Sequence, residues 1–158
     1  MNFGNYAILG PVEHTFEKEP TWTWTIKPID MGAELAMSQF MARDRFVVFP
    51  DGARALRQIT TEEIAMREIA LTFGGTTIPA VREAVDTEVK KQATRTSGAP
   101  LLPEDATIAA VEGVLCSMPP AMVKEIWEAV GQACPPWGPQ LPNQKDEGQA
   151  KKAPGKKS

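Results

Sequence analysis

Two pairs of adjacent prolines bracket one helical pattern near the C-terminal end of the sequence and limit where it can begin and end. Pro119–Pro120 suits a first helical turn, whose N–H groups have no helical partner, whereas Pro135–Pro136 disfavours helix in the residue before it. Between the pairs, apolar residues recur at helical spacing: Met122, Val123, Ile126, Trp127, Val130 and Cys134. The pattern predicts a helix with one apolar face, which packs either against its own domain or against a partner.

A second helix is predicted by the stretch ITTEEIAMREIALTFGG, residues 59–75. Thr60 and Glu63 have the spacing of a capping box, and Gly74–Gly75 predicts the end of the helix. Apolar residues cover most of its circumference, so we expect a central helix contacted from several sides. Its polar side is expected to consist mainly of Glu62, Arg67 and Glu68.

Strand patterns come earlier in the chain. TWTWTIKPI, residues 21–29, alternates Trp22, Trp24 and Ile26 with polar residues, which predicts a strand with one buried face. Arg45–Phe49 predicts a second strand, and a turn at Pro50–Gly52 allows the following residues to return as its antiparallel partner. Between these strands a helix is predicted, with Asp30 as its cap.

Two further helices are predicted at 78–92 and 104–118. The first has only a narrow apolar stripe and is expected to be mostly exposed, whereas the second is more apolar. Their apolar residues are Val81, Val85 and Val89 in the first, and Ile108, Val111, Val114, Leu115 and Met118 in the second.

These patterns predict an α+β, helix-rich fold, in which a small N-terminal antiparallel β-sheet is followed by a bundle of four to five helices. A single globular domain is expected over residues 1–137, with strands at about 21–58 and helices at about 60–135. Residues 138–158 are expected to form a flexible basic tail, because Lys, Gly, Gln and Pro provide little apolar area there.

The charge is divided unevenly along the chain. Residues 143–158 carry five lysines against Asp146 and Glu147, a net charge of +3, so the remainder of this −3 chain carries −6. An acidic body argues against a large nucleic-acid surface, although the tail could contact phosphates weakly. No stretch has the roughly 20 apolar residues that span a bilayer, and the N-terminus lacks the pattern of a signal peptide. We therefore expect a cytosolic protein with no membrane contact.

The sequence contains few residues that could form a catalytic, metal-binding or phosphate-binding site. His14 is the only histidine and precedes the predicted elements, so a catalytic triad could form only around it. Cys116 and Cys134 have no CxxC or histidine companions, which predicts reduced core thiols. Gly74–Gly75 follows a helix, whereas phosphate-binding glycines open one. Three glutamates, Glu62, Glu63 and Glu68, could converge on a substrate, but capping and solvation explain them more simply. We expect no enzyme, cofactor or metal site.

Three stretches, taken in order, resemble the tail assembly chaperones of long-tailed, siphovirus-type bacteriophages: residues 21–41, 52–76 and 111–137. The shared features are a Trp-containing strand ending in Lys-Pro, a helix with Glu-Leu, a central Ile-Ala-Leu helix, and a late helix followed by Pro and Trp. Departures from the family pattern are a longer connection at 80–100 and Cys134 in place of a more usual Asn.

The resemblance implies a protein that is not an enzyme. Such chaperones coat the helical tape measure protein in the host cytoplasm, promote polymerisation of the tail tube around it, and are absent from the finished virion. Many also occur as a longer product of a programmed −1 frameshift, through which they contact the tail tube protein. Gly155, Lys156 and Lys157 form dipeptides that a slippery sequence would encode, although they are also ordinary in a basic tail.

Trp137 is the first candidate for partner binding, because it lies beyond the predicted end of the helix, where burial is least assured. The alternative is that it docks back on its own domain. Trp127 and Met122 are further candidates on the apolar face, with Trp127 favoured as a core residue. Two other functions stay open: a small virion structural or adaptor protein, and a nucleic-acid-binding regulator that uses the lysine tail. The sequence gives no indication of oligomeric state.

Overall fold

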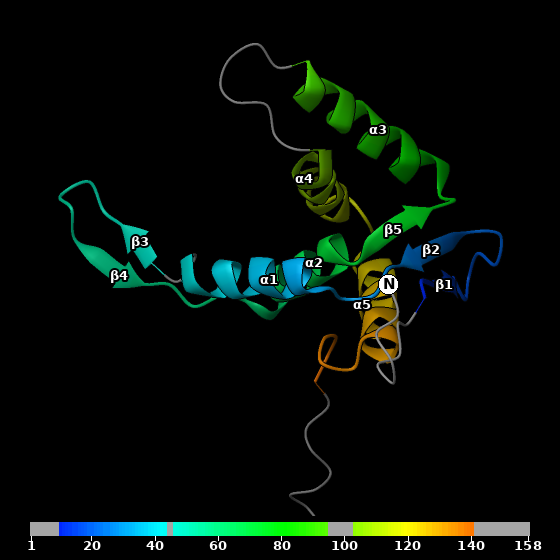
Figure 1. Cartoon of the computed structure of the whole chain (residues 1–158), viewed down its shortest axis with the longest axis horizontal. Helices are drawn as coiled ribbons and strands as arrows, with labels where there is room; N and C mark the ends of the chain where they lie inside the picture. Colours follow the sequence, from blue (N-terminus) through cyan, green and yellow to red (C-terminus); the bar gives the residue numbers. More distant parts are fainter. Residues whose placement is uncertain (1–9, 44–45, 95–102, 141–158) are drawn as a thin grey trace, which may run out of the picture.

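The computed structural model describes residues 10–43, 46–94 and 103–140. Its elements follow one another in this order (Figure 1): β1 (Val12–Thr15), β2 (Thr23–Ile26), α1 (Met31–Arg43), β3 (Phe46–Val48), β4 (Arg54–Leu56), α2 (Thr61–Leu71), β5 (Phe73–Thr76), α3 (Pro79–Ala93), α4 (Pro103–Leu115) and α5 (Pro120–Ala133). The fold is α+β and helix-rich, as the sequence predicted. Gly155, Lys156, Lys157 and the predicted tail from residue 141 lie outside the described residues.

The larger sheet is antiparallel with strand order β1-β2-β5. In the central strand β2, Trp24 and Ile26 are fully buried and alternate with partly exposed threonines, which confirms the predicted one-sided strand. The edge strands β1 and β5 were not predicted, because neither contains an apolar alternation. Tertiary pairing with β2 makes these segments strands.

Gly74 and Gly75 are part of β5, so the prediction that they end helix α2 is wrong. The helix ends at Leu71, and Thr72 is its C-terminal cap. A Cβ atom on Gly74 would lie 3.1 Å from Cγ2 and 3.2 Å from the carbonyl oxygen of Thr25 on the neighbouring strand. Gly75 has a φ of 139°, a conformation that other residues rarely adopt. Gly74 therefore allows the close strand pairing, and Gly75 allows the unusual backbone conformation.

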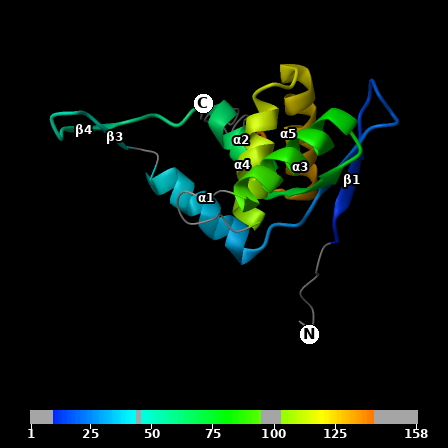
Figure 2. The same cartoon turned by 90° about the horizontal axis from the view of Figure 1, so that it is seen from above.

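A second sheet contains only the hairpin of β3 and β4 among the described strands. Val47 lies opposite Ala55 in the antiparallel register, and a turn at Phe49–Ala53 joins the strands, as predicted. The expectation of one small sheet over residues 21–58 is wrong, because this hairpin does not pair with β2. In Figures 1 and 2 the hairpin lies beyond α1, at the far end from the larger sheet.

Helix α2 is central, and it contacts α1, α4 and α5. Its N-terminus has the predicted capping box: Thr60 Oγ1 accepts from the Glu63 N–H at 3.2 Å, and a Glu63 carboxylate oxygen accepts from the Thr60 N–H at 2.8 Å. The core contains residues of the larger sheet and of the helices, and none of the β3 and β4 side chains whose burial is described belongs to it. Its largest fully buried side chains include Trp24, Ile26, Ile69, Val111, Ile126 and Val130.

The other helices begin close to the predicted positions. On α1, Asp30 Oδ1 accepts from the Ala33 N–H at 2.7 Å, which confirms the cap. On α3, the apolar stripe packs on the core and the remaining residues are mostly exposed. Pro120 is the first residue of α5 and Cys134 is its C-terminal cap, so both proline pairs lie where predicted. The apolar face of α5 packs within its own domain, through Ile126 and Val130.

The two thiols are free but differ in burial. Cys134 is buried, as expected, and burial raises the pKa of its thiol, which keeps the sulfur protonated. Cys116 is exposed, so the prediction that it is a core thiol is wrong. It lies just beyond the last turn of α4, where its Sγ is 3.7 Å from Sδ of Met66.

Candidate partner-binding surface

Trp137 is buried, with only 8% of its surface exposed. The expectation that it is exposed and free to bind a partner is therefore wrong. After α5 the chain turns back, and the Trp137 N–H donates to the Cys134 carbonyl oxygen at 2.8 Å. This turn brings the indole into the core cluster. The alternative in which Trp137 docks on its own domain is therefore the correct one.

Trp127 and Met122 are half-buried and pack against the same core. The Nε1–H of Trp127 donates to Oε2 of Glu68 at 2.6 Å, and the Gly138 N–H donates to the same oxygen at 2.8 Å. Glu68 is only 6% exposed, so its assignment to the solvated face of α2 is wrong. Burial raises the pKa of the Glu68 carboxyl, and the two N–H donors oppose that rise.

His14 is held in a structural contact. It lies in β1, a segment expected to lack regular structure, and its Nε2 is 3.0 Å from Oε1 of Glu125 on α5. The same oxygen accepts from the backbone N–H of Glu17 at 2.9 Å. Together these bonds join the edge of the larger sheet to α5. Within residues 10–43, 46–94 and 103–140, no group of three or more histidine, cysteine, aspartate or glutamate side chains could hold a metal ion.

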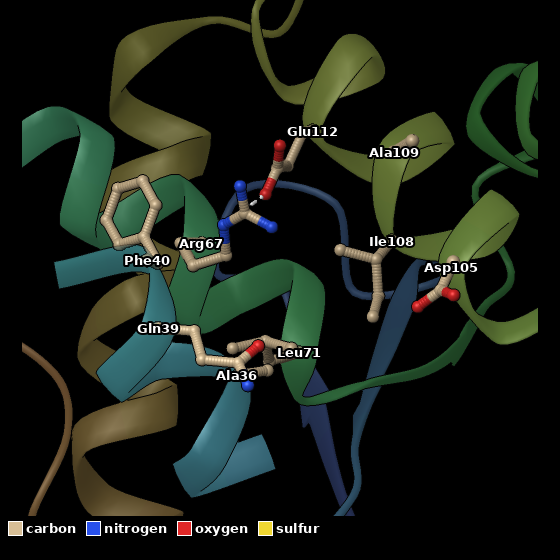
Figure 3. A pocket seen from close by; sticks show the side chains of 9 residues that line it. All are labelled: Ala36, Gln39, Phe40, Arg67, Leu71, Asp105, Ile108, Ala109 and Glu112. Carbon is tan, nitrogen blue, oxygen red and sulfur yellow. Dashed lines mark ion pairs between the residues drawn. The ribbon is translucent and has the colours of Figure 1, made fainter. Parts of the chain in front are cut away.

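A cavity of about 390 Å³ lies where α1, α2 and α4 meet (Figure 3). Arg67 Nε is 2.8 Å from Oε1 of Glu112, and the Arg67 guanidinium lies 4.7 Å from the ring centre of Phe40. Figure 3 shows the Arg67 head group pointing toward Glu112 across the cavity. Because the cation is paired and stacked, this site is best described as a junction that holds three helices together.

Among the described residues, the large exposed apolar side chains lie on α1 and on the hairpin with its turn, apart from Val12 on β1. We name the others the apolar arm; its residues and exposed fractions are Met31 (78%), Leu35 (57%), Val47 (37%), Val48 (63%), Phe49 (48%) and Leu56 (75%). Sequence reasoning missed this surface, although the strand and helix that carry it were predicted. A two-stranded hairpin is marginally stable unless another surface covers it, so an arm of this kind is a candidate for partner contact.

The hairpin holds its apolar residues in a defined arrangement. In its register Leu56 lies opposite Phe46 and Arg54 opposite Val48, so Val48 and Leu56 belong to the same face. The turn is closed by the Phe49 N–H, which donates to the Ala53 carbonyl oxygen at 2.8 Å, and Gly52 adopts a φ of 83°. The arm therefore presents a structured apolar surface.

The base of the hairpin is tied to helix α2. Arg57, immediately after β4, pairs with the carboxylate of Glu63, which also completes the capping box of α2. This pairing with Arg57, together with the Thr60 N–H, lowers the pKa of Glu63. The Arg57–Glu63 pair thus connects the end of the hairpin to the first turn of α2.

None of the helices in the described part of the chain is long and apolar enough to cross a membrane. Trp137, Trp127 and Met122, the three residues predicted for binding, lie in or against the core, whereas the side chains of the apolar arm are exposed, so the arm is the surface most suited to a partner. Comparisons with protein-family models, with curated proteins and with solved structures found no match to this chain.

Proposed function

We propose that this chain is a binding protein that covers an apolar helical client during assembly, and that it acts as a tail assembly chaperone of the long-tailed bacteriophage type. The observation that carries the proposal is the apolar arm. The hairpin exposes Val48, Phe49 and Leu56, and exposed apolar side chains that gather on a protein surface commonly mark a site of interaction with another protein. The arm is also separate from the core cluster, so a partner could cover it without disturbing the core.

The chemistry of the arm suits a helical client. Met31 and Leu35 are four residues apart, so they form a short apolar stripe on the exposed side of α1. An amphipathic helix binds such a stripe through its own residues at helical spacing. The face of the hairpin that carries Val48 and Leu56 adds a second apolar surface. Burial of these residues would stabilise a complex mainly through the hydrophobic effect, which salt screens little.

The identity of the client comes from the resemblance of residues 21–137 to the tail assembly chaperones. In this proposal the client is the tape measure protein, and a longer frameshifted form of the chain contacts the tail tube protein. The protein acts in the host cytoplasm, is not an enzyme, and leaves before the virion is finished. A chain that instead stays in the particle as an adaptor would use the same arm in a permanent contact.

The test is co-expression with the cognate tape measure protein. We expect the client to stay soluble and to be recovered in a complex that survives high salt. The double variant Val48→Lys/Leu56→Lys should lower recovery by about tenfold or more, the usual result of losing central apolar contacts. Gln132→Lys is the matched control, because it adds a lysine at an exposed position of α5, away from the arm.

The possible results of this experiment test the chaperone function and the assignment of the apolar arm as the binding surface separately. A client that is equally insoluble with and without this chain would contradict the chaperone proposal. If Val48→Lys/Leu56→Lys recovered as much client as Gln132→Lys, the arm would not be the binding surface. Mass spectrometry of purified virions would detect the chain if it were a structural component, and its absence there is the result we expect.

A further inference from the structure

Strand β3 has one edge with which no other strand in the described part of the chain pairs. Its other edge pairs with β4, and these two strands make up the second sheet. Figures 1 and 2 show the hairpin beyond α1, at one end of the molecule, and Val48 on β3 is 63% exposed. An edge of this kind presents backbone N–H and C=O groups with which a further strand can pair.

The register of the hairpin shows which backbone groups point outward. The Phe49 N–H donates across the turn to β4 at 2.8 Å, so the backbone groups of this residue point toward β4. These directions alternate along an antiparallel strand. Val47 therefore also points toward β4, whereas Phe46 and Val48 occupy non-hydrogen-bonded pairs. The N–H and C=O groups of Phe46 and Val48 thus point to the open edge.

Charge distinguishes the edge of β3 from that of β4. Proteins commonly protect an exposed sheet edge with charged side chains. Strand β4 contains Arg54, and the residue after the strand is held to α2 by the Arg57–Glu63 pair. Residues 46–49, with the sequence Phe-Val-Val-Phe, contain no charged side chain. The edge of β3 therefore lacks the protection that the edge of β4 has.

We infer that β3 pairs with β3 of a second copy of this chain, in an antiparallel dimer with two-fold symmetry. The outward-pointing residues of the two strands must face each other in such a pair. One register achieves this for both residues: Phe46 of each copy lies opposite Val48 of the other. Val47 then lies opposite its own copy on the two-fold axis, and no like charges meet across the interface.

A second copy fits this edge better than other occupants do. A helix, such as the client proposed above, cannot pair with it, because the backbone bonds of a helix are made internally. Pairing of β3 with β4 of a second copy would leave an open edge at each end and would continue without limit. The two-fold dimer instead joins the two hairpins into one sheet of four strands. Such a sheet is more stable than an isolated hairpin.

The dimer leaves the apolar face of the hairpin available. Val48 and Leu56 lie on one face, whereas the pairing uses backbone groups at the edge between the faces. In the sheet of four strands, this face of one copy continues into that of the other. The inference therefore does not depend on the proposed function. Because each β3 strand has only three residues, the interface is small and the association is weak and concentration-dependent.

Sedimentation equilibrium of the full-length chain tests the association. We expect a monomer–dimer equilibrium, with dimers detectable at about 0.1–1 mM chain, the range of a small interface. A chain that stays monomeric up to about 1 mM would overturn the inference. Open-ended oligomers would also overturn it, because they would show pairing of β3 with β4 of the next copy.

Proline substitutions test which edge is used. Val48→Pro removes an outward N–H from the β3 edge but no bond within the hairpin, and it should weaken dimerisation at least about tenfold. Leu56→Pro is the matched control, because it removes an outward N–H from the β4 edge, and it should dimerise as the native chain does. Val48→Thr keeps the N–H and should also dimerise. If either control lost as much dimer as Val48→Pro, or if Val48→Pro lost none, the assignment to the β3 edge would be wrong.

Cross-linking tests the register. Val47→Cys would face its own copy with Cβ atoms about 4.5–5.5 Å apart, close enough for a disulfide after a small adjustment. Ala55→Cys is the control, because it lies on β4 and would be three strand spacings, about 14 Å, from its own copy. Both variants carry Cys116→Ser, since that thiol is exposed.

Under mild oxidation we expect Val47→Cys to form covalent dimers at least about tenfold faster than Ala55→Cys, because only the first pair is within disulfide reach. Equal rates for the two variants would overturn the inferred register. These measurements use this chain alone, without the tape measure protein. Their failure would therefore leave the proposed chaperone function untouched, and failure of the client experiment would leave the dimer untouched.

Discussion

The indole of Trp127 and the carboxylate of Glu68 are joined across 2.6 Å, which links α5 to α2 at a buried position. The same carboxylate oxygen accepts from the Gly138 N–H, so one side chain fixes both a helix and the segment after it. Glu68 therefore has a larger role than the solvation of a helix face, and it can be tested by substitution.

Replacing Glu68 with leucine should destabilise the chain by about 1–3 kcal/mol, because the N–H groups of Trp127 and Gly138 would be buried without an acceptor. Glu68→Gln keeps a carbonyl oxygen that can accept both bonds and should cost much less. Urea unfolding followed by far-ultraviolet circular dichroism gives both free energies. Equal losses for the two variants would show that the acceptor is unimportant.

The stability contributed by Glu68 should fall as the pH rises. Burial raises the pKa of this carboxyl in the folded state, so the folded chain binds the proton more tightly than the unfolded chain. The contribution is fully present below the unfolded pKa and is lost as the pH rises through the folded pKa. Urea midpoints of the native chain, compared with those of Glu68→Gln, should decline relative to the variant across this window. A difference that does not change with pH would contradict the prediction.

Loss of the capping box at α2 should be measurable. Thr60→Ala removes the oxygen that accepts from the Glu63 N–H and should cost about 0.5–2 kcal/mol, the usual range for an N-cap. Thr61→Ala, at the neighbouring exposed position, is a suitable control. If the two variants had the same urea midpoint, other contacts would be holding the end of the helix.

The capping glutamate should give a pH dependence of the opposite sign to that of Glu68. Pairing with Arg57 and the Thr60 N–H lowers the pKa of Glu63 in the folded state. Its stabilisation is present above the unfolded pKa and is lost as the pH falls through the lowered folded pKa. Arg57→Gln should therefore reduce the loss of stability on acidification, and unfolding curves taken across the acidic range would reveal it. An unchanged acid profile would count against this pairing in solution.

The apolar arm should contribute little to the stability of the free chain. Val48→Lys/Leu56→Lys changes two side chains that are 63% and 75% exposed, so we expect a change within about 0.5 kcal/mol per site. Thermal unfolding of the double variant and of Gln132→Lys should therefore nearly coincide. A large loss of stability in the double variant would mean that the arm packs on the body, and its effect on client recovery would then reflect folding.

Local chemistry in the sequence was sufficient for several elements. The limits of α5 follow from proline, which removes an N–H donor and restricts the residue before it. The start of α2 follows from Thr60 and Glu63, whose bonds join residues three positions apart. The turn before β4 follows in the same way from Pro50–Gly52. In each case the interacting groups are close in the sequence, so the pattern is visible without the fold.

Only the tertiary structure decided the remaining features, because their partners are distant in the sequence. β5 is a strand because Gly74 can approach Thr25, and β1 is a strand because it pairs with β2. Glu68 is buried because donors from residues 127 and 138 satisfy it, and Trp137 is buried because the chain turns back after α5. Apolar patterning showed which residues favour burial, but not that the hairpin would be left outside the core. That outcome depends on how much apolar surface the packed helices and sheet cover among themselves, a property of the whole assembly of elements.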